Sequence, residues 1–181
     1  MLRHINVTEL GAFITGPPGV GKTTLVVKVV ERLRAMGVGV TGFYTIEARE
    51  QGTRVGFRLV NVNSGEWRWL AHVSAVEGPM VGRYHVNVDA VEWGLTLLNE
   101  PGDLYVIDEV GPMEMKHPLF LTRVEDVVKS RHFIVTVHVR MTDWLRSRSS
   151  LGRVFRLSYV NRDAVASDVL NYLRDLITRV G

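Results

Sequence analysis

Gly16-Pro17-Pro18-Gly19-Val20-Gly21-Lys22-Thr23 is the stretch of this 181-residue chain that decides the predicted fold. It matches the pattern G-x-x-x-x-G-K-[ST] at every defined position. The glycines let backbone N–H groups turn toward phosphate oxygens, and a helix that begins near Lys22 would direct its positive end at the same anion. We therefore predict a phosphate-binding loop with Lys22 on the β- and γ-phosphates, Thr23 on Mg²⁺ and the next residue, Thr24, near the α-phosphate.

The segments on either side of this loop indicate an α/β fold. A short apolar run, Gly11 to Thr15, stops at the loop as a buried strand would, and after Lys22 apolar residues recur at helical spacing until Gly37. Farther along, helical patterns alternate with apolar runs: the helical patterns cover 89–100, 119–129 and 165–180, and the runs cover 103–108, 133–139 and 154–159. This alternation predicts a mostly parallel sheet covered by helices.

A different pattern occupies residues 42–71. Extended-looking runs at 42–46, 54–62 and 66–70 are separated by the turn signals Glu50-Gln51-Gly52 and Asn63-Ser64-Gly65. We interpret this segment as an antiparallel β-meander inserted into the α/β plan. The length of the chain favours a single domain that includes the insertion.

Two adjacent carboxylates follow the apolar residues Leu104 to Ile107. Asp108 is expected to hold Mg²⁺, as in a Walker B strand. Glu109, which strand alternation places on the other side, is expected to activate the attacking water. Val110 and Gly111 follow directly and are expected beside the nucleotide, whereas we expect Glu114 to be structural. The alternative is an ordinary turn after a buried strand.

Weaker candidates lie elsewhere in the chain. Thr136 and His138 fall on one face of the predicted 133–139 strand, and either is a candidate sensor of the γ-phosphate, with a satisfied polar residue as the equal alternative. Several arginines are candidates to neutralise transition-state charge, although solvated surface positions are the favoured reading: Arg49 and Arg54 in the meander, and Arg146, Arg148 and Arg153 in a serine-rich loop. For Trp67 and Trp69 we favour mutual packing over stacking on a base or a partner.

The composition narrows the classes of protein that remain. Hydrophobic residues make up 46% and charged residues 23%, as in globular proteins, and the lack of cysteine excludes disulfides and thiolate metal sites. No apolar run reaches the roughly 20 residues of a membrane span, and Met1 to Asn6 lacks the apolar core of a secretion signal. We expect a cytoplasmic monomer. A net charge of +3 suits polyphosphate ligands and leaves nucleic acid open as a partner.

Five stretches together resemble the THEP-type (cancer-related) nucleoside-triphosphatase family over nearly the whole chain: GPPGVGKTT at 16–24, TGFYTIEAREQGTRVGF at 41–57, VGRYHV at 81–86, LYVIDEVGPMEM at 104–115 and VNRD at 160–163. The resemblance implies a RecA-like (ASCE) P-loop fold. It also implies Mg²⁺-dependent hydrolysis of ATP, GTP and other triphosphates to diphosphate and phosphate. Arg49, Asn161 and Arg162 match family-like positions, but the resemblance does not assign their roles.

Two other functions use the same loop. A nucleotide or small-molecule kinase would transfer the phosphoryl group to a bound acceptor, and residues 146–153 are the segment that most resembles a kinase lid. A nucleotide-switched accessory protein that binds nucleic acid would use slow hydrolysis only to time a conformational state. Glu109 argues against the kinase, and the basic charge leaves the accessory protein open.

Overall fold

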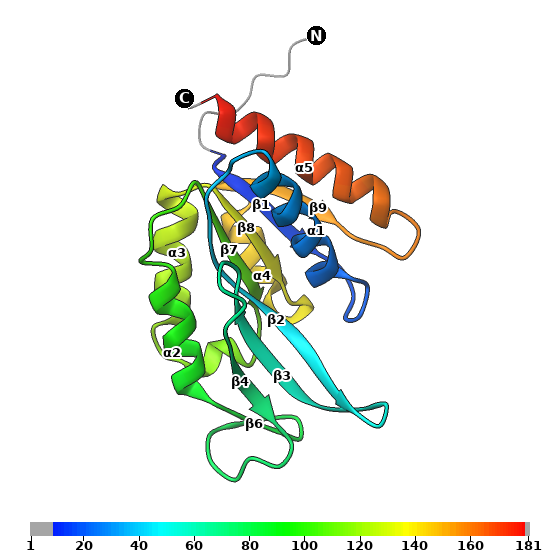
Figure 1. Ribbon diagram of the computed structural model, residues 1–181, viewed down its shortest axis with the longest axis vertical. Helices are drawn as coiled ribbons and strands as arrows, with labels where there is room; N and C mark the ends of the chain where they lie inside the picture. Colours follow the sequence, from blue (N-terminus) through cyan, green and yellow to red (C-terminus); the bar gives the residue numbers. More distant parts are fainter. Residues whose placement is uncertain (1–8, 180–181) are drawn as a thin grey trace.

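The computed structural model describes residues 9–179, in which one nine-stranded mixed sheet is flanked by helices on both faces (Figure 1). The strand order is β5-β6-β4-β3-β2-β7-β8-β1-β9. The strands are β1 (Gly11–Thr15), β2 (Val40–Glu50), β3 (Thr53–Asn61), β4 (Trp67–His72), β5 (Met80–Val81), β6 (Tyr84–Val86), β7 (Leu104–Val110), β8 (Phe133–Val137) and β9 (Gly152–Arg156). The helices are α1 (Lys22–Ala35), α2 (Val88–Leu97), α3 (Phe120–Ser130), α4 (Thr142–Arg148) and α5 (Arg162–Thr178), with short 3₁₀ turns η1 (Glu114–Lys116) and η2 (Val139–Met141).

Five strands, β2, β7, β8, β1 and β9, run parallel to one another and form the core of the sheet. The central strands β7, β8 and β1 are mostly apolar because both of their faces are covered; every residue of β8, for example, is buried. Parallel strands end at the same edge of a sheet, so the loop after β1 and the carboxylates of β7 meet there. This confirms the predicted α/β fold with a parallel core.

Helices cover the two faces in two groups. Helices α1 and α5 pack against each other and against one face, and α2, α3 and α4 lie on the other (Figure 1). Each group has its own core, with Leu33 and Leu173 fully buried in the first and Phe13 and Phe120 in the second. Burial of this apolar surface from both sides fixes the position of the sheet edge that carries the site.

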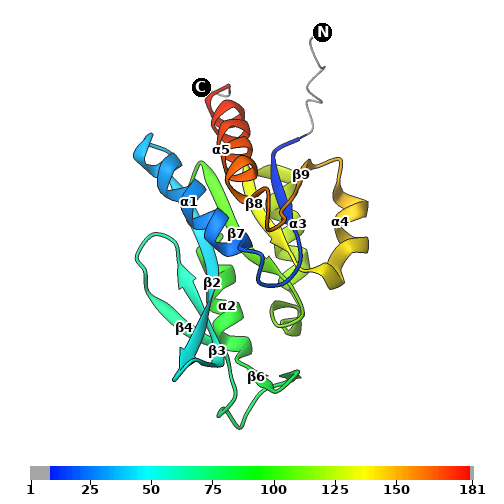
Figure 2. The same ribbon diagram turned by 90° about the vertical axis from the view of Figure 1, so that its right-hand side faces the viewer.

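The antiparallel part of the sheet is larger than the predicted meander. Strand β2 pairs with β7 from Val40 to Phe43 and continues antiparallel to β3 as far as Glu50. The antiparallel strands also extend past residue 71, since β6 pairs with β4 and β5 pairs with β6. We call residues 46–86 the antiparallel wing, which projects from the α/β body (Figure 2).

Packing of the two tryptophans in the antiparallel wing is as predicted. The rings of Trp67 and Trp69 meet edge to face with centroids 5.5 Å apart. The guanidinium of Arg58 lies over both, 4.2 Å from the ring centroid of Trp67 and 5.0 Å from that of Trp69. The cluster therefore combines aromatic and cation–π contacts.

The prediction that residues 146–153 form a serine-rich loop is wrong. Arg146 and Arg148 belong to helix α4, and Arg153 lies in β9. Serine suggested a loop, but here its hydroxyl bonds to the helix backbone: the hydroxyl of Ser147 donates to the carbonyl of Trp144 (2.8 Å). The predicted 154–159 strand is likewise shifted, since β9 ends at Arg156 and residues 157–161 form a loop before α5.

The sequence predicts neither a membrane span nor a secretion signal, and the structure bears only on the first. Among residues 9–179, no helix has the length and apolar character needed to cross a bilayer. The stretch from Met1 to Asn6, which bears on secretion, lies outside the described residues.

Candidate active site

The loop between β1 and α1 has the backbone that an anion-binding loop needs. Gly21 precedes α1 with φ 105° and ψ 28°, a left-handed conformation that glycine adopts without strain. No side chain caps this helix, so its first N–H groups remain available to an anion. Val20 is buried in the core below, whereas Pro17, Pro18, Gly19 and Thr24 are exposed. The exposed part of the loop is thus accessible from solvent.

Lys22 is the first residue of α1 and is 8% exposed. Its Nζ donates hydrogen bonds to the carbonyls of Gly16 (2.9 Å) and Pro17 (3.3 Å). Burial lowers the pKa of Lys22, and the negative charges of Glu109 and Asp108 raise it. The ammonium group is therefore held between the phosphate-binding loop and the two carboxylates.

Asp108 is 2% exposed and accepts hydrogen bonds from three threonines on three elements. The hydroxyl of Thr23 donates to Oδ2 (2.7 Å), the backbone N–H of Thr45 donates to Oδ2 (3.2 Å), and the hydroxyl of Thr136 donates to Oδ1. Burial raises the pKa of Asp108, while these hydrogen bonds and the charge of Lys22 lower it. The carboxylate is fixed in orientation beside Thr23.

The contacts of two of these threonines with Asp108 depend on the fold. Thr136 donates to Asp108 and is therefore a satisfied polar residue, which from the sequence alone is the equal alternative to a contact with the γ-phosphate. Thr45 is absent from the predicted site, although its hydroxyl also donates to the backbone carbonyl of Asp108 (2.8 Å). The one available signal is its place in the 42–46 strand, but only the pairing of β2 with β7 brings that strand to Asp108.

The alternation that would place Glu109 on the opposite side of the strand from Asp108 is interrupted in β7. The register between β7 and β8 shifts between Ile107 and Val110, so one extra residue of β7 interrupts the alternation. The charge of Glu109 acts on both Lys22 and Asp108. Burial, followed by the charge of Asp108, raises the pKa of Glu109 to about 7, although Lys22 opposes the rise. Glu109 is thus a mostly buried carboxyl whose pKa lies near neutral pH.

The residues after Glu109 differ in their burial and in their contacts with the carboxyls of the site. The side chain of Val110 is buried in the core, and its carbonyl accepts a hydrogen bond from the backbone N–H of His138 (3.0 Å). Gly111 lies against two carboxyls: a Cβ placed on it would be 2.9 Å from Oε1 of Glu109 and 3.2 Å from Oε2 of Glu114. Glu114 is 2% exposed, and burial with the nearby charge of Glu109 raises its pKa well above the usual value. A glycine at position 111 therefore leaves room for the two carboxyls, whereas a residue with a Cβ would crowd them.

Some of the remaining candidates from the sequence lie near the phosphate-binding loop and Lys22, and others lie far from them. His138 lies close enough to Lys22 for their charges to interact, and burial together with that charge lowers its pKa. Arg162 lies against the loop, with Cδ 3.6 Å from the position of a Cβ on Gly21. Asn161 braces the loop before α5 with its side chain. Arg49 is in the antiparallel wing, where it pairs with Glu47 and donates to the carbonyl of Gly52 (2.8 Å).

The donor set fits a hard divalent cation. Thr23 and Asp108 present a hydroxyl and a carboxylate oxygen 2.7 Å apart, which are ligand types that Mg²⁺ accepts. Within residues 9–179 no three His, Asp or Glu side chains gather as a complete metal cage. Mg²⁺ commonly binds through one or two protein groups, substrate phosphates and water, so this pair is sufficient.

Known proteins share both the sequence and the fold. The model of a protein family described as NTPase matches residues 11–170. The nucleoside-triphosphatase THEP1 of Caldivirga maquilingensis is 68% identical over 92% of this chain and 96% of its own length, and that of Archaeoglobus fulgidus is 42% identical over 88% and 96%.

Two solved structures are similar over almost their whole length. The crystal structure of THEP1 from the hyperthermophile Aquifex aeolicus has a TM-score of 0.74 and 29% identity, covering 90% of this chain and 98% of that one. The solution structure of a human cancer-related nucleoside triphosphatase has a TM-score of 0.77 and 34% identity, covering 91% and 97%. With the family model matched from β1 to α5, this chain belongs to the THEP1 family of P-loop nucleoside-triphosphatases.

Proposed function

We propose that this chain hydrolyses ATP, GTP and other nucleoside triphosphates to the diphosphate and phosphate with Mg²⁺. The observation that carries the proposal is the hydrogen bond from Thr23 to Asp108 beside the Lys22 ammonium. It brings a hydroxyl, a carboxylate and a positive charge together at the start of α1, as phosphoryl transfer requires.

The loop binds the triphosphate in this mechanism. Backbone N–H groups from Gly19 to Thr24 surround the phosphate oxygens, and the N-terminus of α1 adds its partial positive charge. Lys22 lies between the loop carbonyls and the carboxylates, where its ammonium meets the β- and γ-phosphates. Thr23 and Asp108 hold Mg²⁺, which when bound neutralises charge on the phosphate oxygens.

Glu109 acts as the general base. Its pKa of about 7 means that a substantial fraction of the carboxyl is ionised at neutral pH and is basic enough to accept a proton from water. Lys22 keeps the ionised form accessible despite burial. We assign the contact with the γ-phosphate to His138, because it follows β8 and its charge interacts with that of Lys22.

The geometry disfavours the kinase alternative. Residues 146–153 suggested a lid from sequence, but Arg148 forms an ion pair with Glu125 of α3 and Leu145 is buried in the core. A segment fixed in this way does not close over an acceptor. The carboxylate Glu109 next to Asp108 supports attack by water instead.

The test is phosphate release from ATP, GTP, CTP and UTP, measured with Mg²⁺ and with chelator, and with and without nucleoside monophosphates. We expect Mg²⁺-dependent release from all four without an acceptor. Transfer of phosphate only onto a monophosphate would establish a kinase. Turnover only in the presence of RNA or DNA would favour the accessory protein.

A further inference from the structure

The positions of the site residues indicate which way the phosphate chain of a bound triphosphate would run along the edge of the sheet. Thr23 donates to Asp108 of β7, and the same carboxylate accepts a hydrogen bond from Thr45 of β2, so the metal and the terminal phosphates belong on that side. Strands β8, β1 and β9 follow in order away from β7. The nucleoside end of a bound triphosphate therefore leaves the loop on the side of β9 and α5.

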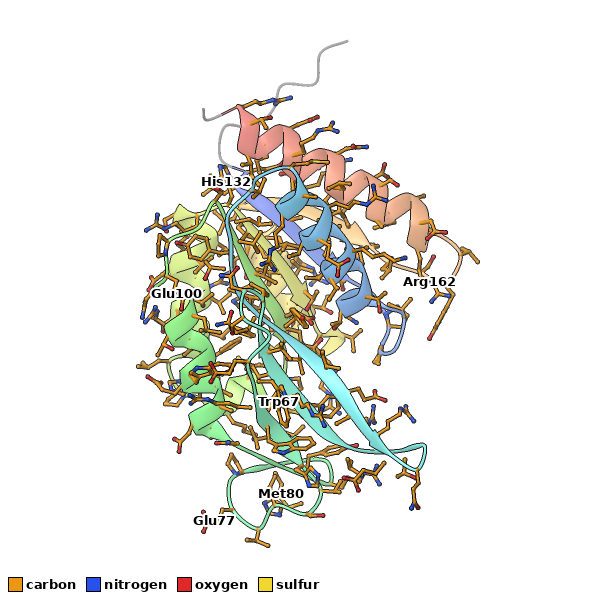
Figure 3. All side chains as sticks on the ribbon, viewed as in Figure 1. Trp67, Glu77, Met80, Glu100, His132 and Arg162 are labelled. Carbon is orange, nitrogen blue, oxygen red and sulfur yellow. The ribbon has the colours of Figure 1, made fainter. Side chains whose placement is uncertain are left out.

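The loop at residues 157–161, between β9 and α5, is joined to the phosphate-binding loop. The N–H of Leu157 donates to the carbonyl of Thr15 (2.8 Å), and the carbonyl of Leu157 lies 2.6 Å from where a Cβ on Gly16 would be. Arg162 completes the contact, with Nη1 4.0 Å and Cδ 3.6 Å from the Cβ position of Gly21 (Figure 3). The two loops therefore form one continuous surface.

This surface presents apolar side chains to solvent. Tyr159 is 60% exposed and Val160 is 97% exposed, while the Arg162 guanidinium lies 5.7 Å from the centroid of the Tyr159 ring. Aromatic rings and arginine planes are the groups on which nucleobases stack. Because the ring of Tyr159 lies directly beyond the phosphate-binding loop, the base of a nucleotide bound at that loop can reach it.

The side-chain amide of Asn161, in the same loop, forms its hydrogen bonds within the loop. Oδ1 of Asn161 accepts a hydrogen bond from the N–H of Ser158 (2.7 Å), and its Nδ2 donates to the carbonyl of Arg156 (3.0 Å). Both ends of this amide, the kind of group that reads the edges of bases, are thus committed to shaping the loop. Stacking does not distinguish one base from another in the way that such hydrogen bonds do.

We propose that Tyr159 and Arg162 form the nucleoside subsite. The base stacks on the ring of Tyr159, and Arg162 holds that ring and closes the gap to Gly21. The subsite accepts all four bases because its main contact is stacking. This inference rests on the proposed triphosphatase function and adds the group that binds the part of the substrate that does not react.

The experiment compares wild type with Tyr159→Ala and Tyr159→Phe, using the four nucleoside triphosphates as substrates and inorganic tripolyphosphate as a competitive inhibitor. Tripolyphosphate carries the phosphate chain without the nucleoside, and its inhibition constant is measurable whether or not it is hydrolysed. We expect Tyr159→Ala to raise KM for every nucleotide by roughly fivefold to thirtyfold. The kcat and the tripolyphosphate inhibition constant should stay within about twofold, and Tyr159→Phe should behave as wild type.

The control is Trp67→Ala, which removes the exposed aromatic side chain of the antiparallel wing, far from Arg162 in Figure 3. It should leave KM unchanged. An NTP-specific loss in Trp67→Ala would move the base to the antiparallel wing and overturn the proposal. So would an unchanged Tyr159→Ala, or one that weakens tripolyphosphate equally. If wild type releases no phosphate from any nucleotide, the triphosphatase function itself fails.

Discussion

The hydroxyl of Thr23 donates a hydrogen bond to Oδ2 of Asp108 over 2.7 Å, linking the first turn of α1 to β7 across 85 residues of sequence. Thr23 directly follows the phosphate-binding loop, and Asp108 lies near the end of the buried strand β7. Because Asp108 is buried, this bond also stabilises its ionised form. The pair therefore couples metal binding to the charge state of the site.

Removing the Thr23 hydroxyl should weaken the binding of the Mg²⁺ on which activity depends. In Thr23→Val the shape is kept but the oxygen is lost, so we expect half-maximal activity to require at least about tenfold more Mg²⁺. Thr23→Ser restores the hydroxyl and should stay close to wild type. Phosphate release across a Mg²⁺ titration measures both. Identical titration curves for Thr23→Val and wild type would remove Thr23 from the metal site.

Thr136 is expected to matter for stability as well as for catalysis. Thr136→Val removes a donor from a buried carboxylate and should lower the free energy of unfolding by about 1–3 kcal/mol. Thr122→Val, at an exposed position of α3, is the matched control and should change it by less than about 0.5 kcal/mol. Urea denaturation without nucleotide compares them, and equal effects would contradict the role assigned to Thr136.

Glu109 should make the protein less stable as the pH rises. Its pKa is higher in the folded protein, about 7 against 4.5, so its contribution is fully present below pH 4.5 and is lost as the pH rises through 7. Such a rise corresponds to roughly 3 kcal/mol at most. Glu109→Gln should therefore unfold at higher urea than wild type at pH 8, and this gain should vanish near pH 4.5. A gain that does not depend on pH would disprove the assignment.

The packing of Arg58 between two indoles should contribute to the stability of the antiparallel wing. Arg58→Ala is expected to cost about 1–2 kcal/mol of unfolding free energy through lost cation–π contacts. Arg146→Ala removes an arginine whose side chain is 77% exposed and serves as the control, with an effect within about 0.5 kcal/mol. Thermal unfolding of both variants tests this, and kcat should be unchanged in each.

How far the sequence predicts this site depends on the range of the contacts. The β1 strand, the loop and α1 were predictable because glycine spacing and helical periodicity act over a few residues, and the predicted 11–15 strand matches β1. Asp108 was recognisable from the apolar run before it. Thr45 was not, since it reaches Asp108 only through the pairing of β2 with β7.

Other differences have equally physical causes. The orientation of Glu109 depends on a shift of register in β7 that no periodicity reveals. Strands β5 and β6 are too short, at two and three residues, to leave a pattern. Helix α4 was mistaken for a loop because serine favours turns, whereas here its hydroxyl bonds to a helix carbonyl.

Single-turnover phosphate release by Glu109→Gln, set beside its affinity for Mg²⁺ and ATP, tests the role of the site most directly. If Glu109 is the general base, the variant binds nucleotide within a few-fold of wild type but releases phosphate roughly 10²- to 10⁴-fold more slowly. Lys22→Ala, in contrast, should lose binding. Turnover at the wild-type rate in Glu109→Gln would show that the carboxylate beside Asp108 does not activate water, and the proposed mechanism would be wrong.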